Sequence, residues 1–421
     1  MVCRPARTFV ACVWLCVWLY VCSAGTSADD WPQFLGPHRT GISRETKLFD
    51  AWPQGGAQEV WRVPGGIGMS GLAIERGKLV TMVQNDRHQE VICLNSETGQ
   101  TFWRTAVAPA YRNPQGNGPR ATPAIVDDQV LTFSGAGILT ALNLMDGSIL
   151  WTHDLVEQFA GEVADYGMAC SPLVVGDRVV VTIGAPAATV VALNRDSGEL
   201  AWKAGQSSTA GYSSPALLNV GGRLQVVAFV GKALLGLDPD SGSVLWSYPF
   251  ETDFDCNIAA PIAYREQVFI SAGENHGCVM LRLVPEGDQF KPTPVWSSID
   301  VKSVMRNEWQ TSILLDEFLY GFDNVGSAGP VTHLTCVNAQ TGERVWRKTR
   351  FGKGNLIYAD GKFFISTMAG DLVVVKATPD RYEEIGRQNV RVKTRQSPAI
   401  ANGRLYLRDR ATILCLDIRE P

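Results

Sequence analysis

Charged residues are scarce in this sequence, at 19% of 421 residues, and positive charge is not in excess, because 42 Asp and Glu face 38 Lys and Arg. A mechanism that depends on a basic surface, such as nucleic-acid binding, is therefore a poor first hypothesis. The chain lacks a Cys-x-x-Cys pair, which argues against zinc-ribbon, thioredoxin-like and c-type haem motifs. It also lacks a long apolar stripe of 3.6-residue period, which argues against helical solenoids. The 45% hydrophobic residues and 41 glycines that are present indicate a core-forming, turn-rich chain.

The first 28 residues are predicted to be an export signal. After two arginines, an uncharged apolar run covers Phe9–Cys22, and six small residues then precede Asp29. We expect cleavage after Ala28, with Ala24 as the alternative site. An uncleaved anchor and a lipid anchor on Cys22 stay open, although the apolar run is shorter than the roughly 17–25 residues of a membrane span. We expect the mature protein in the periplasm or outside the cell, without a membrane span.

A repeated motif dominates the rest of the sequence. Its form is a small residue, an apolar residue, Asn or Asp, two residues, Ser, Thr or Asp, then Gly, three residues and Trp. The five full copies begin at Cys93, Ala141, Ala192, Gly236 and Cys336. Degenerate copies end at Trp61 and Trp296. The glycine in each copy fits a hairpin turn that requires a positive φ, so each copy predicts two antiparallel strands.

A further strand opens with proline or its equivalent upstream of each motif, where the missing N–H is tolerated. These strands begin near Ser70, Thr122, Ser171, Ser214, Ala260, Thr311, Asn355 and Ser397. Four antiparallel strands in every 40–50 residues predict an all-β fold, an eight-bladed β-propeller of four-stranded antiparallel blades. The last copy stops before a Trp-bearing strand, and the strand around Trp61 has no partner before it. We therefore expect the N-terminal strand to complete the C-terminal blade and close the ring.

The repeat predicts three parts of the chain and the state of several cysteines. The parts are a signal peptide at 1–28, a lead-in at 29–57 that packs on the propeller, and the propeller at 58–421. Three cysteines, Cys93, Cys336 and Cys415, occupy the small-residue position of the motif, so we expect them to be buried and unpaired. Cys256 and Cys278 share one blade and are the pair to test for a disulfide.

These residues carry a family resemblance. The five copies of the motif, and the opening residues 31–37 (Trp-Pro-Gln-Phe-Leu-Gly-Pro) with Arg39-Thr40-Gly41, resemble the PQQ-like (pyrroloquinoline quinone repeat) β-propeller family and the lead-in of its exported bacterial members. The family includes quinoprotein dehydrogenases and non-enzymatic propellers of the outer-membrane assembly factor B type. The resemblance implies that tryptophans dock one blade on the next. Those residues are Trp61, Trp103, Trp151, Trp202, Trp246, Trp296 and Trp346.

The dehydrogenases' functional pattern is not matched. The chain has no adjacent cysteines, no haem motif and little length for loops that cover a cofactor. Candidate calcium ligands are present (Asp255, Asn257, Asp323 and Asn324), but they do not have the family's spacing. We therefore predict no catalytic residue, no metal and no cofactor, with PQQ and calcium as the alternative.

The loops that lead into the innermost strands should ring the mouth of the central channel. The third residue before each proline equivalent is Met69, Arg120, Ala169, Tyr212, Ile258, Trp309, Lys353 and Arg395. The three cations of this ring would attract an anionic group, and its two large aromatics could contact the same ligand. The alternative is a structural role, in which the cations pair with acidic residues of equivalent loops. Those acidic residues are Asp165, Glu308 and Asp255.

Other polar and aromatic side chains receive less specific predictions. His276 and His333 belong to long loops at Gly273–Gly277 and Gly321–His333, where we expect them to be solvated and not catalytic. Trp31 and Trp52 precede the repeats, and we expect them to pack on the outside of the propeller.

The favoured function is that of an exported, non-catalytic propeller. It would act as a monomeric binding or scaffold module for a protein, peptide or glycan partner in the cell envelope. One alternative is a PQQ-dependent alcohol or sugar dehydrogenase, in which Arg120, Lys353 and Arg395 hold the cofactor carboxylates and Trp309 stacks on the ring. The other is a propeller that binds an anionic ligand or a polysaccharide, with an affinity that falls with added salt and with Arg395→Ala.

Overall fold

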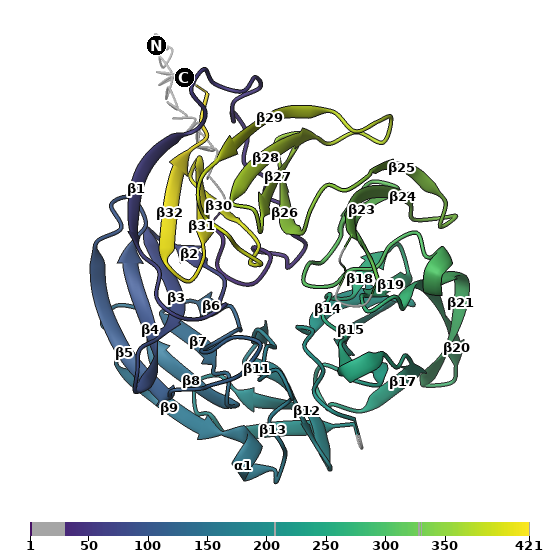
Figure 1. Ribbon diagram of the computed structural model, residues 1–421. Coiled ribbons are helices and arrows are strands. Elements are labelled where there is room, and N and C mark those ends of the chain that lie inside the picture. Colours follow the sequence, from purple (N-terminus) through teal and green to yellow (C-terminus); the bar gives the residue numbers. More distant parts are fainter. Residues whose placement is uncertain (2–29, 206–207, 327–328, 330, 421) are drawn as a thin grey trace.

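The described residues form eight four-stranded antiparallel sheets that follow one another around a ring (Figure 1). The structure is a computed structural model, and it describes residues 1, 30–205, 208–326, 329 and 331–420. Apart from Met1, the expected leader, including Cys22, lies outside the described residues. Within those residues, no helix is long and apolar enough to cross a bilayer. The expected eight-bladed β-propeller is confirmed.

The first four blades are consecutive in the chain. Blade 1 contains β2 (Ala73–Glu75), β3 (Lys78–Gln84), β4 (His88–Asn95) and β5 (Thr101–Pro109). Blade 2 contains β6 (Ala124–Val126), β7 (Gln129–Phe133), β8 (Ile138–Asn143) and β9 (Ile149–Asp154), which the short α1 (Leu155–Gln158) follows. Blade 3 contains β10 (Leu173–Val175), β11 (Arg178–Ala185), β12 (Ala188–Asn194) and β13 (Leu200–Ala204). Blade 4 contains β14 (Ala216–Val220), β15 (Arg223–Phe229), β16 (Ala233–Leu237) and β17 (Val244–Pro249).

The remaining blades complete the ring. Blade 5 contains β18 (Ile262–Tyr264), β19 (Gln267–Ala272), β20 (Gly277–Glu286) and β21 (Gln289–Ile299), with 3-10 turns at Asp253–Asp255 and Asp300–Lys302 on either side. Blade 6 contains β22 (Ile313–Leu315), β23 (Phe318–Val325), β24 (Val331–Asn338) and β25 (Arg344–Lys348). Blade 7 contains β26 (Gly354–Ala359), β27 (Lys362–Thr367), β28 (Asp371–Lys376) and β29 (Glu384–Asn389). Blade 8 contains β30 (Ala399–Ala401), β31 (Arg404–Arg408), β32 (Thr412–Asp417) and β1 (Gln58–Pro64).

The repeated motif folds into the turn between the two outer strands of a blade. In blade 1, the side chain of Asn95 accepts hydrogen bonds from the N–H groups of Glu97 and Thr98, and the Gly99 N–H donates to the Asn95 carbonyl oxygen. Gly99 has a φ of 73°, a conformation that side chains other than glycine's rarely adopt. The Asn and the Gly of the motif therefore have separate tasks: the amide oxygen satisfies the turn's donors, and the glycine permits its geometry.

Five of the motif tryptophans pack against the motif glycine of the following blade. The pairs are Trp61 with Gly99, Trp103 with Gly147, Trp151 with Gly198, Trp202 with Gly242 and Trp296 with Gly342. The Trp61 indole lies against Gly99, and its Nε1–H donates to the Ser96 carbonyl oxygen at 2.9 Å. The indole N–H groups of five other tryptophans also donate to carbonyl oxygens of the next blade. Those tryptophans are Trp103, Trp151, Trp202, Trp296 and Trp346. The constant spacing of glycine and tryptophan in the motif therefore produces contacts between neighbouring blades.

Trp246 is the exception. Its indole N–H donates to the Gln225 side chain of its own blade at 2.6 Å. The following blade replaces the motif turn with a long hairpin, in which β20 and β21 pair as far as Glu286 and Gln289. Trp246 still packs in a hydrophobic cluster shared by blades 4 and 5, so it contributes to docking by packing.

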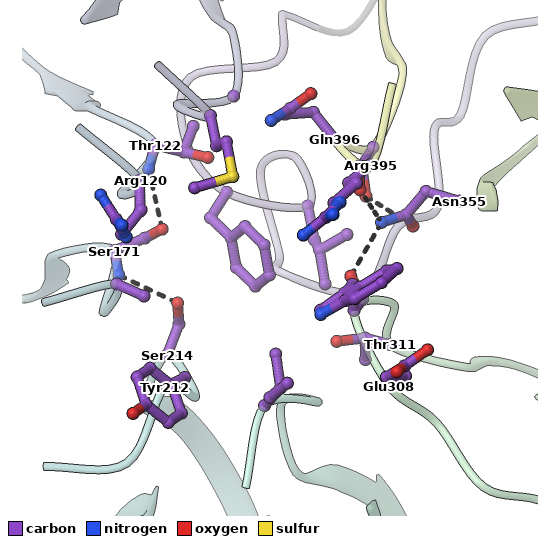
Figure 2. A pocket seen from close by; sticks show the side chains of 18 of the residues that line it. Arg120, Thr122, Ser171, Tyr212, Ser214, Glu308, Thr311, Asn355, Arg395 and Gln396 are labelled. Carbon is purple, nitrogen blue, oxygen red and sulfur yellow. Dashed lines mark hydrogen bonds between the residues drawn. The ribbon is translucent and has the colours of Figure 1, made fainter. Parts of the chain in front are cut away.

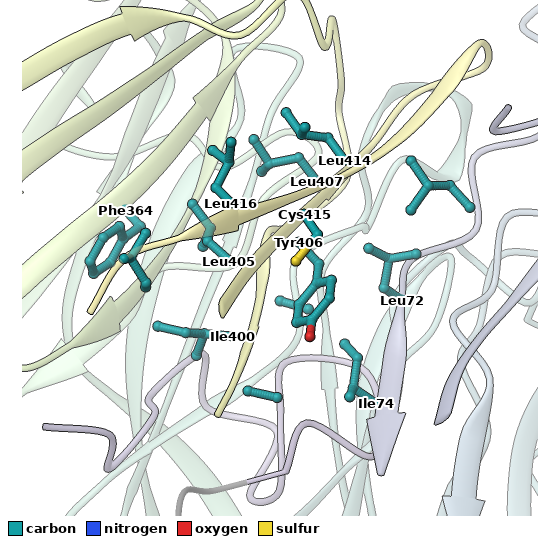
Figure 3. Packing of buried hydrophobic residues seen from close by; sticks show 14 of the residues in the cluster. Leu72, Ile74, Phe364, Ile400, Leu405, Tyr406, Leu407, Leu414, Cys415 and Leu416 are labelled. Atoms are coloured by element: carbon teal, nitrogen blue, oxygen red, sulfur yellow. The ribbon is translucent and has the colours of Figure 1, made fainter. Parts of the chain in front are cut away.

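The N-terminal strand closes the ring, as expected. β1 pairs antiparallel with β32, and Trp61 lies opposite Cys415. In Figure 1 the purple β1 lies beside the yellow β32. The seam buries a large hydrophobic cluster that joins blades 7, 8 and 1 and includes Phe364, Leu405, Tyr406 and Ile74 (Figure 3). Burial of this cluster and the hydrogen bonds between β1 and β32 together hold the N-terminal strand in the C-terminal blade.

The lead-in does not lie wholly on the outside. Residues 31–43, which we call the channel plug, cross the channel between the innermost strands. Trp31 exchanges backbone hydrogen bonds with Ile74 of β2, and Ser43 donates to the Tyr358 carbonyl oxygen of β26. Trp31 is only 2% exposed. The prediction that Trp31 packs outside is therefore wrong, whereas Trp52 does pack against Gly386 on the outer strand of blade 7.

Every cysteine outside the leader is unpaired in the structure. Cys93, Cys336 and Cys415 are fully buried, as their position in the motif predicts. The pair proposed for a disulfide test is not bonded. Cys278 lies inside β20, whereas Cys256 belongs to the loop before β18.

Candidate functional site

A pocket of about 350 Å³, which we call the mouth pocket, lies where the loops before the innermost strands converge. Seven of the eight positions predicted to ring the channel line it. They are Met69, Arg120, Ala169, Tyr212, Ile258, Trp309 and Arg395. Figure 2 shows Arg120 and Tyr212 on one side of the pocket and Arg395 and Glu308 on the other. The alignment of the repeats thus places these residues together, and their role in ligand binding stays a prediction.

Lys353, the eighth position, lies beside the pocket and not among its lining residues. Its Nζ is 3.0 Å from Glu308 Oε2 and 4.2 Å from the centre of the Trp309 ring. Burial raises the pKa of Glu308, and the neighbouring Lys353 opposes that shift. Of the two roles expected for the channel cations, Lys353 therefore has the structural one, because it pairs with an acidic residue of a neighbouring loop.

Arg395 stacks on Trp309, with Cζ 4.0 Å from the ring centre. Such a cation–π contact contributes about 0.5–2 kcal/mol, depending on how far the pair is desolvated. Burial lowers the pKa of Arg395, and Glu308 partly offsets this effect. The Asn355 side chain donates to the carbonyl oxygens of Trp309 and Arg395, each at 3.1 Å, and so joins the two loops.

Arg120 is held by its own loop on the other side of the pocket. Its Nη2 donates to the Gly116 carbonyl oxygen at 2.7 Å, and its Nη1 donates to that of Gly118. Its Cζ lies 4.9 Å from the centre of the Tyr111 ring. Neutral carbonyls fix the direction of the guanidinium but leave its charge uncompensated.

Four arginines in and around the channel form no ion pair with Asp or Glu anywhere in the described part of the chain. They are Arg39, Arg120, Arg395 and Arg408. Burial lowers the pKa of Arg39 to about 10 and that of Arg408 to about 9. Because a positive charge in a poorly solvated cleft raises the local concentration of anions, the channel should attract them although the chain is acidic overall.

Aromatic side chains form the wall on the side of blades 3 to 5. Tyr166 stacks on Tyr212 with ring centres 5.5 Å apart, and Phe254 follows at 6.5 Å from Tyr166. Phe254 is 61% exposed and has a φ of 59°. An exposed aromatic residue in a left-handed conformation is costly, and such residues cluster at functional sites. Sequence reasoning found Tyr212 but missed Tyr166 and Phe254.

Hydroxyl groups just below the mouth link neighbouring blades. The Thr122 N–H donates to Ser171 Oγ at 3.0 Å, and the Ser171 N–H donates to Ser214 Oγ at 2.9 Å (Figure 2). In the same way the Ala260 N–H donates to Thr311 Oγ1 at 2.9 Å. The sequence signal for these links is the Ser or Thr that directly precedes proline in four copies of the repeat. Those residues are Thr122, Ser171, Ser214 and Ser397.

We expect Ser171→Ala to lower the free energy of unfolding by about 1–3 kcal/mol, because the buried Thr122 N–H loses its acceptor. Urea denaturation followed by tryptophan fluorescence measures the change. Ser148→Ala, on an exposed turn of blade 2, is the control and should change stability by less than about 0.5 kcal/mol. Equal effects of the two substitutions would contradict the linking role of Ser171.

The candidate calcium ligands are used within the fold. Asp323 is buried and pairs with Arg306 at 2.7 Å and with Arg344 at 3.3 Å. The Asn257 side chain donates to three backbone carbonyls, while Asp255 accepts from Thr209. Among the described residues, no three His, Cys, Asp or Glu side chains are grouped to hold a metal. The donor set therefore does not fit the calcium ion that would accompany a quinone.

Contrary to expectation, His333 is buried and His276 is half-buried. The His276 ring packs 4.3 Å from Phe250, and burial lowers the pKa of His276. His333 is 8% exposed, its Nδ1 accepts from the Arg350 N–H, and burial lowers its pKa. The expected loop Gly321–His333 is also largely strand, because β23 extends to Val325 and β24 begins at Val331.

Comparison with known proteins gives one family. A family model described as outer membrane protein assembly factor BamB matches residues 87–320 and 331–420. BamB of Yersinia pestis is 30% identical over 167 residues, which cover 37% of this chain and 38% of that protein. BamB of Escherichia coli K12 is 32% identical over 114 residues, which cover 26% of this chain and 27% of that protein. The chain thus aligns with less than two fifths of the length of these relatives.

Solved structures share the fold at low sequence identity. BamB from Moraxella catarrhalis has a TM-score of 0.59 at 15% identity and covers 86% of this chain and 98% of that one. Quinohemoprotein alcohol dehydrogenase from Comamonas testosteroni has a TM-score of 0.65 at 13% identity and covers 93% of this chain and 81% of that one. At these sequence identities the similarity supports the propeller fold alone.

Proposed function

Because the chain belongs to the protein family described as outer membrane protein assembly factor BamB, we propose that it is an exported, non-catalytic β-propeller that binds a protein or peptide partner in the cell envelope. The observation that carries this proposal is the mouth pocket, in which Arg120 and Arg395 form no ion pair with a described Asp or Glu side chain and lie near the exposed Phe254. Arginine and aromatic side chains are enriched where proteins bind other proteins.

The first 28 residues of the sequence support the proposed cellular location. A positively charged start, an apolar run and small residues before Asp29 support export through a secretory signal. The names of the relatives refer to assembly of outer-membrane proteins, which supports a partner in the same compartment. We propose that the mature protein works as a monomer in the periplasm.

Photo-cross-linking in the envelope fraction tests the proposal. A photoreactive residue at Gln115, which is exposed and lines the mouth pocket, should capture a discrete partner. The same residue at Gln340, on an exposed turn between outer strands, is the control site. Arg120→Gln combined with Arg395→Gln should reduce the yield at Gln115 about tenfold, because the loss of desolvated charge contacts raises the dissociation rate.

Two outcomes would contradict the proposal. One is capture at Gln115 that is as efficient in the double variant as in the unaltered protein, with folding intact. The other is dye-linked oxidation of an alcohol or sugar after quinone and calcium are added, without any discrete cross-link at the mouth. Arg381→Gln is the matched charge control, because this side chain is 74% exposed beside Glu383 on an outer turn.

A further inference from the structure

The mouth pocket is blind. Trp31, Phe34 and Leu35 of the channel plug line it from within the channel. The plug is held there by Arg39, which donates to the carbonyl oxygens of Ser171 and Pro172 at 3.1 and 2.9 Å. A ligand that enters from the mouth therefore meets a wall of side chains and cannot thread through the ring.

The size of the pocket limits what can enter. A volume of about 350 Å³ lies near the lower end of the roughly 300–1,000 Å³ that is typical of small-ligand pockets. A folded surface or a continuous strand that passes along the mouth would leave this depth unfilled. The end of an extended chain can enter it.

The walls discriminate between the two ends of a chain. Arg120 and Arg395 lie on different sides of the pocket and form no ion pair with an acidic side chain in the described part of the protein (Figure 2). Two carboxylates, Glu274 and Glu308, also line the pocket, but Lys353 lies 3.0 Å from Glu308. Guanidinium groups bind a carboxylate in a two-pronged geometry and repel an ammonium group.

The inner surface is apolar and favours an apolar side chain at that end. Trp31, Leu35 and Leu72 are at most 3% exposed, and Met69 and Ile258 add further apolar surface to the lining. Burial of a Leu-sized side chain on such a surface contributes about 1.5–3 kcal/mol. The pocket thus pairs cationic walls with an apolar interior.

From this combination we propose that the mouth pocket binds the C-terminal end of a partner's chain. The terminal carboxylate binds Arg395, the positive charge of Arg120 on the other side of the pocket adds to the attraction, and an apolar last side chain packs toward the plug. This inference rests on the proposed binding function and names the part of the partner that is recognised. In this arrangement the last residue of the partner occupies the blind interior. The residues before it contact the exposed Phe254 and the half-buried Tyr166.

Titration calorimetry with matched peptides tests the inference on the mature protein. One eight-residue peptide ends in leucine as the free acid, a second has the same sequence as the C-terminal amide, and a third is the free acid ending in lysine. We expect the free acid ending in leucine to bind at least tenfold more tightly than the other two. Its affinity should fall as salt is raised, whereas binding of the amide should change little.

Variants assign the effect to the pocket. Arg395→Gln should remove most of the preference for acid over amide, and Phe34→Ala should weaken both peptides to a similar extent. Arg381→Gln should change neither affinity. Thermal unfolding confirms that each variant is folded, and the acid-to-amide comparison on the unaltered protein requires no variant.

The outcomes separate this inference from the proposed function. Equal binding of acid and amide overturns the C-terminal inference, even where cross-linking at Gln115 still depends on Arg120 and Arg395. Binding of phenylacetate as tightly as the peptide also overturns it, because the ligand would then be a small carboxylate and not a chain end. Loss of cross-linking dependence on the two arginines overturns the proposed function itself.

Discussion

Trp61→Ala is expected to lower the free energy of unfolding by about 3–5 kcal/mol, the usual cost of truncating a buried aromatic residue. Trp61 is 8% exposed and lies 6.0 Å from the Tyr406 ring in the cluster at the seam. Its indole also donates to Ser96 in blade 1. One substitution thus opens a cavity in blade 8 and removes a link to blade 1, at the place where the ring is closed by pairing of the two ends. Urea denaturation measures the loss.

The preceding residue supplies the control for this substitution. Val60 belongs to the same strand and is 37% exposed, so Val60→Thr should change the free energy of unfolding by less than about 0.5 kcal/mol. If Trp61→Ala costs no more than Val60→Thr, the seam does not limit the stability of the propeller. A larger cost for Trp61 than for a tryptophan between consecutive blades, such as Trp151, would mean that the seam is the weakest junction.

The blades could be predicted because each recurring residue of the motif has a defined structural role that depends on residues close to it in sequence or at a fixed position in the next repeat. Asn95, Gly99 and the tryptophan four residues later each have one task, in a turn, a left-handed conformation and a packing contact. Five copies at constant spacing therefore determine strand order, and the unmatched strand around Trp61 predicts the closure with β32.

The lead-in and Trp246 could not be predicted in the same way, because they have no second copy for comparison. Trp31 is buried inside the channel through backbone pairing with Ile74, which no pattern in residues 31–37 encodes. Trp246 has the motif but lacks the partner turn, since blade 5 uses a long hairpin instead. In both cases the outcome depends on a neighbour remote in sequence.

The mouth pocket also has one property that the sequence predicts and one that it does not. The alignment places Arg120, Trp309 and Arg395 at the pocket because these positions are equivalent in the repeat. Which cation is compensated depends on loop conformation, so Lys353 lies beside Glu308 whereas Arg120 bonds to backbone carbonyls. Sequence can therefore locate the charges of such a site, but their compensation is a property of the fold.

The second large effect expected is on blade docking, and Gly342→Ala should lower the free energy of unfolding by about 2–5 kcal/mol. Gly342 has a φ of 75°, and a Cβ there would lie 2.6 Å from the Trp296 ring. An alanine must therefore bear the cost of a left-handed conformation, about 1–2 kcal/mol, and of overpacking, typically 1–3 kcal/mol.

Gly361→Ala separates these two costs. Gly361 has a φ of 74°, nearly the same as that of Gly342, but no atom lies within 4 Å of the position of its Cβ. It should therefore show the conformational cost alone, and the difference between the two alanine variants measures the contact with Trp296. A difference near zero would mean that the motif glycine serves only its own turn. A difference above about 1 kcal/mol would mean that the constant spacing of Gly and Trp maintains the contact between blades.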